Sequence, residues 1–238
     1  MPDSSQAMRP TAPAVVPALR PSEYTSALIQ VLRAEAARVH GVHVLEIGCG
    51  SGVVLAALGA MGAASLCGID IEPDAIAASR RLLGDLGHNA IAELHQGDMW
   101  RPVAGRRFDL IVANLPHFPM EPDEFAGRLP SWSAGGADGR SLLDPFLMGL
   151  AGHLTAGGRA VITHNAFDDL ARSRELAAQN GLSIKVALTT LVYISPEKLA
   201  RMTTDVLRTE SGHTLYRHGP YTFGEMHILE IAAAGTAI

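Results

Sequence analysis

The stretch of residues 44–52 limits the possible folds of this chain more than any other. It reads Val-Leu-Glu-Ile-Gly-Cys-Gly-Ser-Gly, so a mainly apolar strand runs into glycines at alternate positions, and a helical pattern follows. Glycine lets the backbone turn sharply and lets a ligand approach it closely. Strand, glycine turn and helix in this order predict the first unit of a parallel sheet with a ligand at the strand end. A glycine turn that binds nothing is the alternative.

Apolar strands and helical stretches alternate along the rest of the chain, which is typical of strand-helix-strand units. The pattern begins with a helix capped by Ser22 and stopped by Gly41. It predicts an α/β fold with a Rossmann-like, seven-stranded, mostly parallel sheet and helices on both faces. The expected strands are residues 43–47, 65–69, 92–96, 110–113, 159–163, 183–194 and 225–232, and the later helices are residues 53–61, 73–86, 144–154, 167–180 and 196–207.

The composition favours one folded domain, residues 19–238. Of the 238 residues 47% are hydrophobic and 18% are charged, which excludes a wholly disordered chain. Residues 1–18 hold four prolines among small side chains, so we expect a flexible N-terminal arm there. Residues 196–223 are expected to be an insertion between the last two strands.

Charge, cysteine content and hydropathy exclude several classes of protein. The formal net charge of −5 offers no broad cationic surface, so nucleic acid is not an expected partner. Two cysteines, Cys49 and Cys67, do not make a disulfide framework. No apolar run approaches the ~20 residues that span a bilayer, and the first residues lack the order of a signal peptide. We therefore expect a cytoplasmic protein without a membrane contact.

Glu46 stands directly before the glycines and indicates which ligand they bind. A carboxylate at the strand end repels a pyrophosphate and attracts an ammonium group. S-adenosylmethionine carries both an ammonium and a sulfonium, so the charge favours it as the cofactor. The cofactor-binding candidates in this stretch are Glu46, Gly48, Cys49, Gly50 and Gly52.

Acidic residues also follow the next two predicted strands. Asp70 comes roughly 20 residues after the glycine turn, where a carboxylate can accept both ribose hydroxyls, with Ile71 beside it. Glu72 is the competing candidate, and its other interpretation is a charge at a helix start. Asp98 can accept the adenine amino group while Met99 lies along the ring.

The fourth predicted strand leads into Asn114-Leu115-Pro116-His117-Phe118, which we assign to the acceptor substrate. The Asn114 side-chain oxygen and the Leu115 carbonyl can accept hydrogen bonds from a planar N–H group. Two such acceptors hold the nitrogen towards the sulfonium methyl, so catalysis is mainly by positioning. We expect Asn114 and His117 to be catalytic and Leu115, Pro116 and Phe118 to bind substrate. A proline-rich turn without function is the alternative.

In this order, these motifs resemble class I methyltransferases, and in detail the release-factor glutamine methyltransferases with an N-P-P-Y motif. Residues 19–25, Leu-Arg-Pro-Ser-Glu-Tyr-Thr, resemble the segment before that family's first helix and add Tyr24 as a candidate substrate-binding residue. Residues 134–139, Ala-Gly-Gly-Ala-Asp-Gly, resemble its G-G-x-D-G segment, and residues 154–159 its turn before the fifth strand. The resemblance covers residues 20–180 and implies S-adenosylmethionine as cofactor.

Three departures from that family bear on the substrate. The family's N-terminal helical domain has no counterpart in this sequence, so release factor is not the expected substrate. His117 replaces the tyrosine of the motif, where it can stack, act as a base or bind a carboxylate, or else lie in solvent. Residues 196–223 have no recognised counterpart, and Tyr216 and Tyr221 there are candidate substrate-binding residues. A surface loop or a homodimer contact is the alternative for that region, and its scattered histidines form no metal-ligand pattern.

The sequence thus predicts an S-adenosylmethionine-dependent N-methyltransferase for a small-molecule, amino-acid or peptide-like acceptor. Three alternatives remain open. The acceptor can be a protein glutamine or an RNA base. The altered turn can instead promote cleavage or cyclisation of the cofactor with release of methylthioadenosine. The chain can also be a binding module that holds the cofactor without catalysis.

Overall fold

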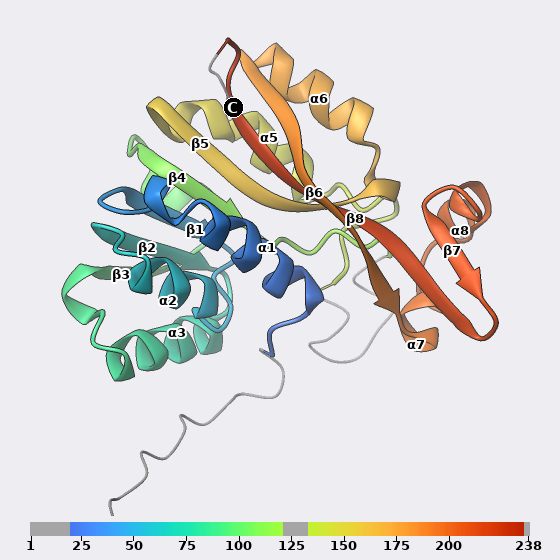
Figure 1. Cartoon of the computed structure of the whole chain (residues 1–238), viewed down its shortest axis with the longest axis horizontal. Coiled ribbons are helices and arrows are strands. Elements are labelled where there is room, and N and C mark those ends of the chain that lie inside the picture. The colour runs from blue at the N-terminus through green and yellow to red at the C-terminus, as the bar shows by residue number, and fades with distance from the viewer. Residues whose placement is uncertain (1–19, 121–132, 236–238) are drawn as a thin grey trace, which may run out of the picture.

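One twisted sheet organises the chain, and the strand that precedes the glycine turn lies near its middle. In this computed structural model, residues 20–120 and 133–235 are described, so the expected N-terminal arm, residues 1–18, lies outside the described residues. The strands stand in the order β3-β2-β1-β4-β5-β8-β6, and β7 pairs with β8 (Figure 1). Their bounds are β1 His43–Ile47, β2 Ser65–Asp70, β3 Ala92–Gln96, β4 Phe108–Ala113, β5 Leu154–Asn165, β6 Leu182–Ile194, β7 Leu215–His218 and β8 Tyr221–Ala233.

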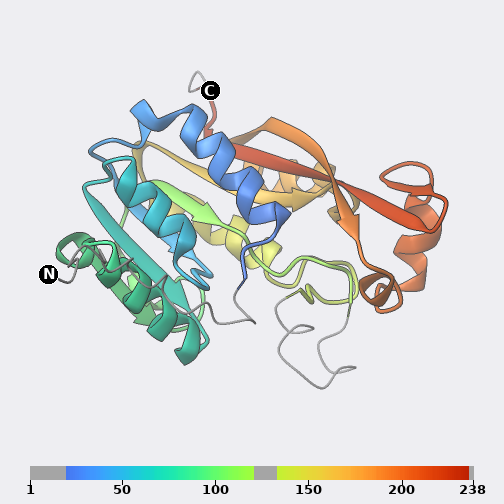
Figure 2. The same cartoon turned by 60° about the horizontal axis from the view of Figure 1, so that its bottom comes forward.

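Helices cover both faces of this sheet (Figures 1 and 2). The apolar sides of α1 (Glu23–Ala34), α2 (Val53–Ala60) and α3 (Pro73–Asp85) share one core with one set of alternate strand residues. α5 (Leu143–His153) and α6 (Leu170–Gln179) share a second core with the other set. Val44 faces the first core and Leu45 the second, as the two-residue period of a strand requires.

The direction of the sheet places ligand-binding groups at one edge. β1 pairs in parallel with β2 on one side and with β4 on the other. The chain therefore builds the sheet first in one direction from β1 and then in the other. Ligands of such sheets bind where the crossover direction changes, at the carboxyl ends of the strands. The residues that follow β1, β2, β3 and β4 therefore come together at that edge.

The fold class predicted from the sequence is confirmed, and several details differ, among them the following. The sheet contains an additional strand, β7. The helix expected over residues 196–207 is two helices, α7 (Pro196–Leu199) and α8 (Thr204–Glu210). β5 begins five residues before the expected start, because Leu154 already pairs with Phe108, and after an irregularity in register the pairing resumes at Arg159. The helix expected from residue 167 begins as a short 3-10 turn, Ala166–Asp168, and continues as α6 after Asp169 turns through a φ of 55°.

The last part of the chain extends beyond the rest of the sheet. β6 and β8 pair along their whole lengths, and β7 adds a third strand at their far end (Figure 1). α7 and α8 connect β6 to β7, so the expected insertion, residues 196–223, consists of two helices and a hairpin. Within the described residues, no helix has the length and apolar character needed to cross a membrane.

Candidate active site

A cavity of about 510 Å³ lies at the carboxyl ends of β1 to β4, beside the start of α1. Its volume is in the range of small-molecule sites. Most residues selected from the sequence line it, namely Tyr24, Glu46, Gly48, Cys49, Gly50, Asp70, Ile71, Asp98, Met99, Asn114, Leu115, Pro116, His117 and Phe118. Three other selected residues, Gly52, Tyr216 and Tyr221, are not part of the lining.

The glycine turn is held by its neighbours in a conformation that favours glycine. Gly48 and Gly50 have φ angles of 73° and 51°. The amides of Gly48 and Cys49 donate to the carbonyl of Ile69, at 2.8 and 2.9 Å. The Gly50 amide donates to Asp70 Oδ2 at 2.8 Å, while Asp70 Oδ1 accepts from the Glu72 amide at 2.9 Å. Asp70 therefore joins the first two strand ends into one rigid rim of the cavity.

Gly52 packs one helix against another instead of lining the cavity. Its φ is 78°, and a Cβ atom there would lie 2.8 Å from Ser79 Oγ and 2.9 Å from Ser79 Cα. The Ser79 hydroxyl, fully buried on α3, donates to the Gly50 carbonyl at 3.1 Å. Gly52 therefore makes room for the α3 serine that supports the turn, and its assignment to cofactor binding stays a prediction. Sequence reasoning missed Ser79, which shows no signal besides its place on a helix.

Glu46 is a buried carboxylate with an unpaired oxygen. Its side chain is 2% exposed, and among the described residues Oε2 has no hydrogen-bond partner. Burial raises the pKa of Glu46 well above its usual range, and the nearby Asp70 carboxylate adds to the rise. A cation brought to this wall of the cavity would pair with Oε2 and favour the ionised form.

The third strand end contributes a strained backbone. Met99 has a φ of 45°, which is uncommon for a residue with a side chain. Backbone strain of this kind tends to occur at functional sites, where the surrounding structure maintains it. Here it places Asp98 and Met99 together in the lining of the cavity, on the side formed by the ends of β2 and β3.

Two threonines from different elements orient Asn114. Its Oδ1 accepts a hydrogen bond from Thr163 Oγ1 on β5 at 2.8 Å, and its Nδ2 donates to Thr25 Oγ1 on α1 at 3.4 Å. A carbonyl oxygen has two lone pairs, so Oδ1 keeps one acceptor position. Neither threonine was selected from the sequence, although Thr25 belongs to the segment that resembles the family.

His117 is buried beside a second buried acid and does not lie in solvent. Its side chain is 5% exposed, and Nδ1 lies 3.3 Å from Oδ2 of Asp168, which is fully buried. Burial lowers the pKa of His117 to about 3, and burial raises the pKa of Asp168 well above its usual range. Near neutral pH the His117 imidazole is therefore uncharged. Tyr24 packs edge-on to the imidazole with 5.4 Å between ring centroids.

The segment that resembles G-G-x-D-G supports this turn from outside the cavity. A Cβ on Gly135 would lie 2.8 Å from the Cα of His117, and one on Gly139 would lie 2.6 Å from its carbonyl oxygen. The Gly135 amide donates to the Phe118 carbonyl at 2.7 Å. These glycines allow two backbone segments to touch, which fixes the position of His117.

The end of β6 and the insertion reach the cavity through residues that the sequence did not indicate. Tyr193 at the end of β6 and Lys198 on α7 both line it, and Lys198 Nζ lies 3.8 Å from the centroid of the Phe118 ring. The predicted Tyr216 and Tyr221 lie on the three-stranded extension. Neither lines the cavity, because the additional strand β7 carries Tyr216 away and Tyr221 begins β8 at the far end, so their assignment to substrate binding stays a prediction.

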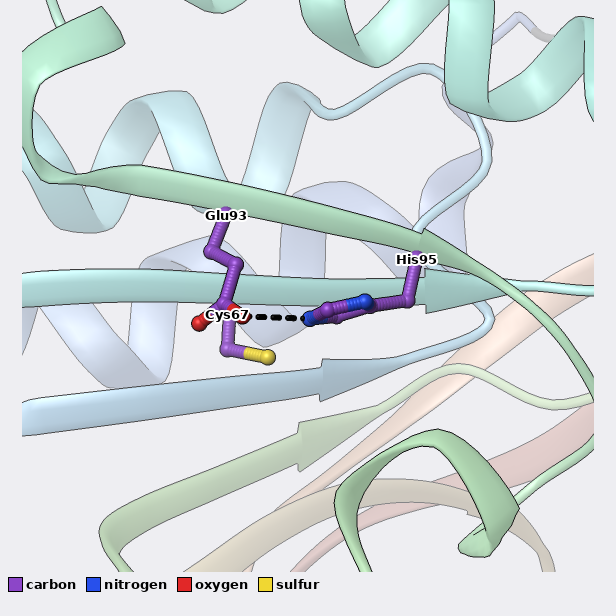
Figure 3. A group of neighbouring side chains, drawn as sticks. All are labelled: Cys67, Glu93 and His95. Carbon is purple, nitrogen blue, oxygen red and sulfur yellow. Dashed lines mark hydrogen bonds and ion pairs between the residues drawn. The ribbon is translucent and has the colours of Figure 1, made fainter.

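A further group of three side chains lies on the sheet away from this cavity. Cys67 on β2 and Glu93 and His95 on β3 have ligand atoms within 4.8 Å of one another (Figure 3). Arg106 already pairs with the Glu93 carboxylate at 2.9 Å, and His95 binds its other oxygen at 2.7 Å. These contacts balance the charge of Glu93, so we assign the group to the packing of the sheet edge.

Comparisons with known proteins agree with this geometry. Residues 44–129 match the methyltransferase domain family. The release factor glutamine methyltransferase of Geobacter sulfurreducens is 31% identical over 126 residues, which cover 50% of this chain and 44% of that protein. The ribosomal protein uL3 glutamine methyltransferase of Bradyrhizobium diazoefficiens is 31% identical over 118 residues, covering 48% and 35%. The chain thus spans half or less of the length of these two relatives.

Solved structures show the same fold. One chain of the E. cuniculi Mtq2-Trm112 complex superposes with a TM-score of 0.59 and 15% identity, covering 90% of this chain and 98% of that one. The ribosomal protein L11 methylase of Lactobacillus delbrueckii subsp. bulgaricus gives a TM-score of 0.54 with 20% identity, covering 88% and 78%. At these identities the similarity concerns the fold alone.

The residues present fit the cofactor that this fold implies. The unpaired oxygen of buried Glu46 suits the ammonium group of S-adenosylmethionine. A Cβ on Gly48 would lie 3.5 Å from Leu115, and one on Gly50 would meet nothing within 4 Å, so the turn leaves room for a close ligand. The strand-end carboxylates of Asp70 and Asp98 line the same cavity. The site, the sheet and the comparisons together show a class I methyltransferase fold whose cavity suits S-adenosylmethionine, and the chain is similar in sequence to glutamine methyltransferases.

Proposed function

We propose that this protein transfers the methyl group of S-adenosylmethionine to the planar nitrogen of a peptide-like acceptor, with a glutamine side-chain amide as the first candidate. The observation that carries the proposal is Asn114. Thr25 and Thr163 fix its amide in the lining of the cavity, which also includes the acidic strand ends and the rings of Tyr24 and Phe118. A fixed acceptor atom at that point holds an N–H donor in one orientation.

The chain's residues divide between the two ends of the cavity. Glu46 binds the ammonium group, Asp70 the ribose and Asp98 the adenine amino group. The bound cofactor supplies an electrophilic methyl on a positively charged sulfur, with a neutral thioether as leaving group. Asn114 Oδ1 and the Leu115 carbonyl accept the hydrogen bonds of the incoming NH₂ group, and Phe118 and Tyr193 exclude water around it.

His117 has a limited part in proton transfer. Its pKa of about 3 makes the neutral imidazole a weak base. A weak base is sufficient, because an amide nitrogen that has gained a methyl group loses its conjugation and releases its proton readily. The buried pair of His117 and Asp168 therefore shapes the acceptor end, and water or His117 takes the proton.

The choice of acceptor is supported by the chemistry of the turn and by the relatives. Two hydrogen-bond acceptors match the two N–H groups of a primary amide. The relatives of G. sulfurreducens and B. diazoefficiens are named as methyltransferases of glutamine in release factor and in ribosomal protein uL3. A free small molecule with a primary amide satisfies the same contacts, so it is the second acceptor to test. The formal net charge of −5 supports both over RNA.

The test follows the fate of the cofactor and of the acceptor together. The purified protein is incubated with S-adenosylmethionine carrying a deuterated methyl group, alone, with N-acetylglutamine methylamide, and with a mixture of nonapeptides that have a central glutamine. Mass spectrometry is expected to show a labelled methyl group on glutamine and S-adenosylhomocysteine only when an acceptor is present. Methylthioadenosine formed without acceptor would instead support cofactor cleavage, and binding without any product would support a non-catalytic module.

A further inference from the structure

The outer face of the three-stranded extension is an exposed aromatic surface, which we call the aromatic platform. It consists of Leu191 and Tyr193 on β6, Tyr221 and Phe223 on β8, and Tyr216 and His218 on β7. The pairing of the strands places these side chains on the same face of the sheet. Tyr193 pairs with Phe223 and Phe223 with Tyr216, while Tyr221 pairs with His218, and residues two positions apart on a strand point to the same face.

The two faces of the extension differ sharply in burial. Leu191, Tyr193 and Tyr221 are 50%, 43% and 57% exposed. On the opposite face Val192, Ile194, Leu215 and Met226 are at most 5% exposed, and they share a core with Val206 and Leu207 of α8. The fold of the extension is therefore satisfied by its inner face. The aromatic side chains of the outer face are not needed to bury that core.

The platform is continuous with the candidate active site. Tyr193 lines the cavity, and its ring centroid lies 6.2 Å from that of Tyr221 and 5.9 Å from that of Phe223. The ring of His218 continues the row at 6.1 Å from Phe223. A ligand that fills the acceptor end of the cavity therefore meets the platform as soon as it extends past Tyr193.

The size and chemistry of the platform suit a polypeptide. Three adjacent strands span about 10 Å across, and two alternate residues add roughly 7 Å along each strand. That area accommodates about three residues of extended chain beyond the cavity. Tyrosine and phenylalanine are enriched at protein interfaces, where flat rings contact both apolar side chains and peptide groups. A free amino acid or small amide would leave this surface uncovered.

We propose that the aromatic platform binds the polypeptide segment next to the methylated glutamine, so that the substrate is a protein or peptide and not a free small molecule. The inference rests on the proposed transfer to an amide nitrogen. It assigns substrate selection to the extension, which the sequence shows only as a region without a recognised counterpart.

The test compares acceptors with and without flanking residues. The platform variant carries Leu191→Ser and Tyr221→Ser, two exposed positions that do not line the cavity. The matched control carries Leu86→Ser and Met148→Ser, which are 52% and 62% exposed on other elements. For each protein, kcat/KM is measured for the nonapeptide mixture and for N-acetylglutamine methylamide. The ratio of the two values is expected to fall about tenfold in the platform variant and to stay unchanged in the control.

Binding provides a readout that does not depend on turnover. With S-adenosylhomocysteine present, the immobilised nonapeptide mixture is expected to retain the wild-type protein and the control, and to release the platform variant. Retention without methyl transfer would contradict the proposed function and leave the docking surface supported. Equal retention and equal kcat/KM ratios in all three proteins would overturn the inference. A platform variant that binds peptide normally but changes from dimer to monomer in analytical ultracentrifugation would also overturn it, because the surface would then join two copies of the chain.

Discussion

The smallest scale at which this site can be tested is the single amide of Asn114. Replacing Asn114 by alanine removes the side-chain acceptor, and we expect kcat to fall about a hundredfold or more. Thr163→Val keeps the shape of its partner but removes the hydroxyl donor, so kcat should fall about tenfold with an unchanged affinity for S-adenosylmethionine. Single-turnover kinetics and calorimetric binding separate the two effects. An Asn114→Ala protein with normal kcat would exclude the positioning role.

Glu46 gives a prediction about pH. Because burial raises its pKa and the cofactor's ammonium favours the carboxylate, the affinity for S-adenosylmethionine should rise with pH up to that raised pKa and then level off. Glu46→Gln should weaken binding by roughly 1.5–3 kcal/mol and remove this pH dependence. Calorimetry in buffers of different ionisation enthalpy measures both, and wild-type binding without proton release would contradict the assignment.

Glu46 also affects the folding stability of the cofactor-free protein, which should fall with rising pH whereas the affinity for the cofactor should rise. When folding raises the pKa of a carboxyl group, the folded protein becomes less stable as the pH rises above the pKa that this group has in the unfolded chain. The reason is that the group ionises first in the unfolded chain, which favours unfolding. Without cofactor, Glu46→Gln should therefore melt at a higher temperature than the wild type at pH 8, and the difference should shrink towards pH 4. Differential scanning fluorimetry over this range checks the sign.

The low pKa of His117 leads us to expect a kcat that does not change with pH near neutrality. Since burial lowers its pKa to about 3, its titration should produce no change in kcat between pH 5 and 8. His117→Gln should reduce kcat moderately, about tenfold, and leave the shape of the profile unaltered. A wild-type limb near pH 6.5 that is absent from His117→Gln would show instead that the imidazole ionises at its ordinary pKa and acts as the base.

At the scale of elements, the contact between the start of α2 and α3 depends on one glycine. Gly52→Ala combines a positive φ with atoms of Ser79 at 3.0 Å or less, so we expect a loss of roughly 2–4 kcal/mol of unfolding free energy. Gly87 is the matched control, because its φ is 76° and a Cβ would meet nothing within 4 Å. Gly87→Ala should cost only about 1 kcal/mol. Urea unfolding of both variants measures the two losses of unfolding free energy, and their difference is the cost of the steric contact with Ser79. Equal losses in the two variants would contradict this contact.

The elements that the sequence predicted well are those whose neighbours lie close in the chain. β1, the glycine turn and α2 follow from local periodicity and glycine spacing, and β3 has its expected bounds. β7 was missed because its four residues, Leu215–His218, acquire strand character only by pairing with β8. Tyr193 and Lys198 reach the cavity through the twist of β6 and the short α7, which no residue pattern encodes. The partner of His117, Asp168, lies 51 positions later, beyond the reach of any motif.

At the scale of the whole molecule, the two ends of the sheet have separate tasks. The carboxyl ends of β1 to β4 carry the polar groups that we propose as cofactor ligands, while the extension of β6, β7 and β8 places an aromatic surface next to the same cavity. The start of α1 closes the gap between them: Tyr24 donates to Asn165 Oδ1 at 2.7 Å at the end of β5, and Asn165 Nδ2 donates to the His117 carbonyl at 3.3 Å.

The position of the first described residues has a practical consequence. Arg20, Pro21 and Ser22 line the cavity, whereas β8 ends at Ala233 on the opposite side of the sheet, where the Ala234 amide donates to Gly181 (Figure 1). A polypeptide that continues upstream of Arg20 therefore joins the folded part at the mouth of the active site. Affinity tags and fluorescent fusions should be attached at the C-terminal end, where they stay clear of the acceptor, while a reporter dye placed just before Arg20 would sense its arrival.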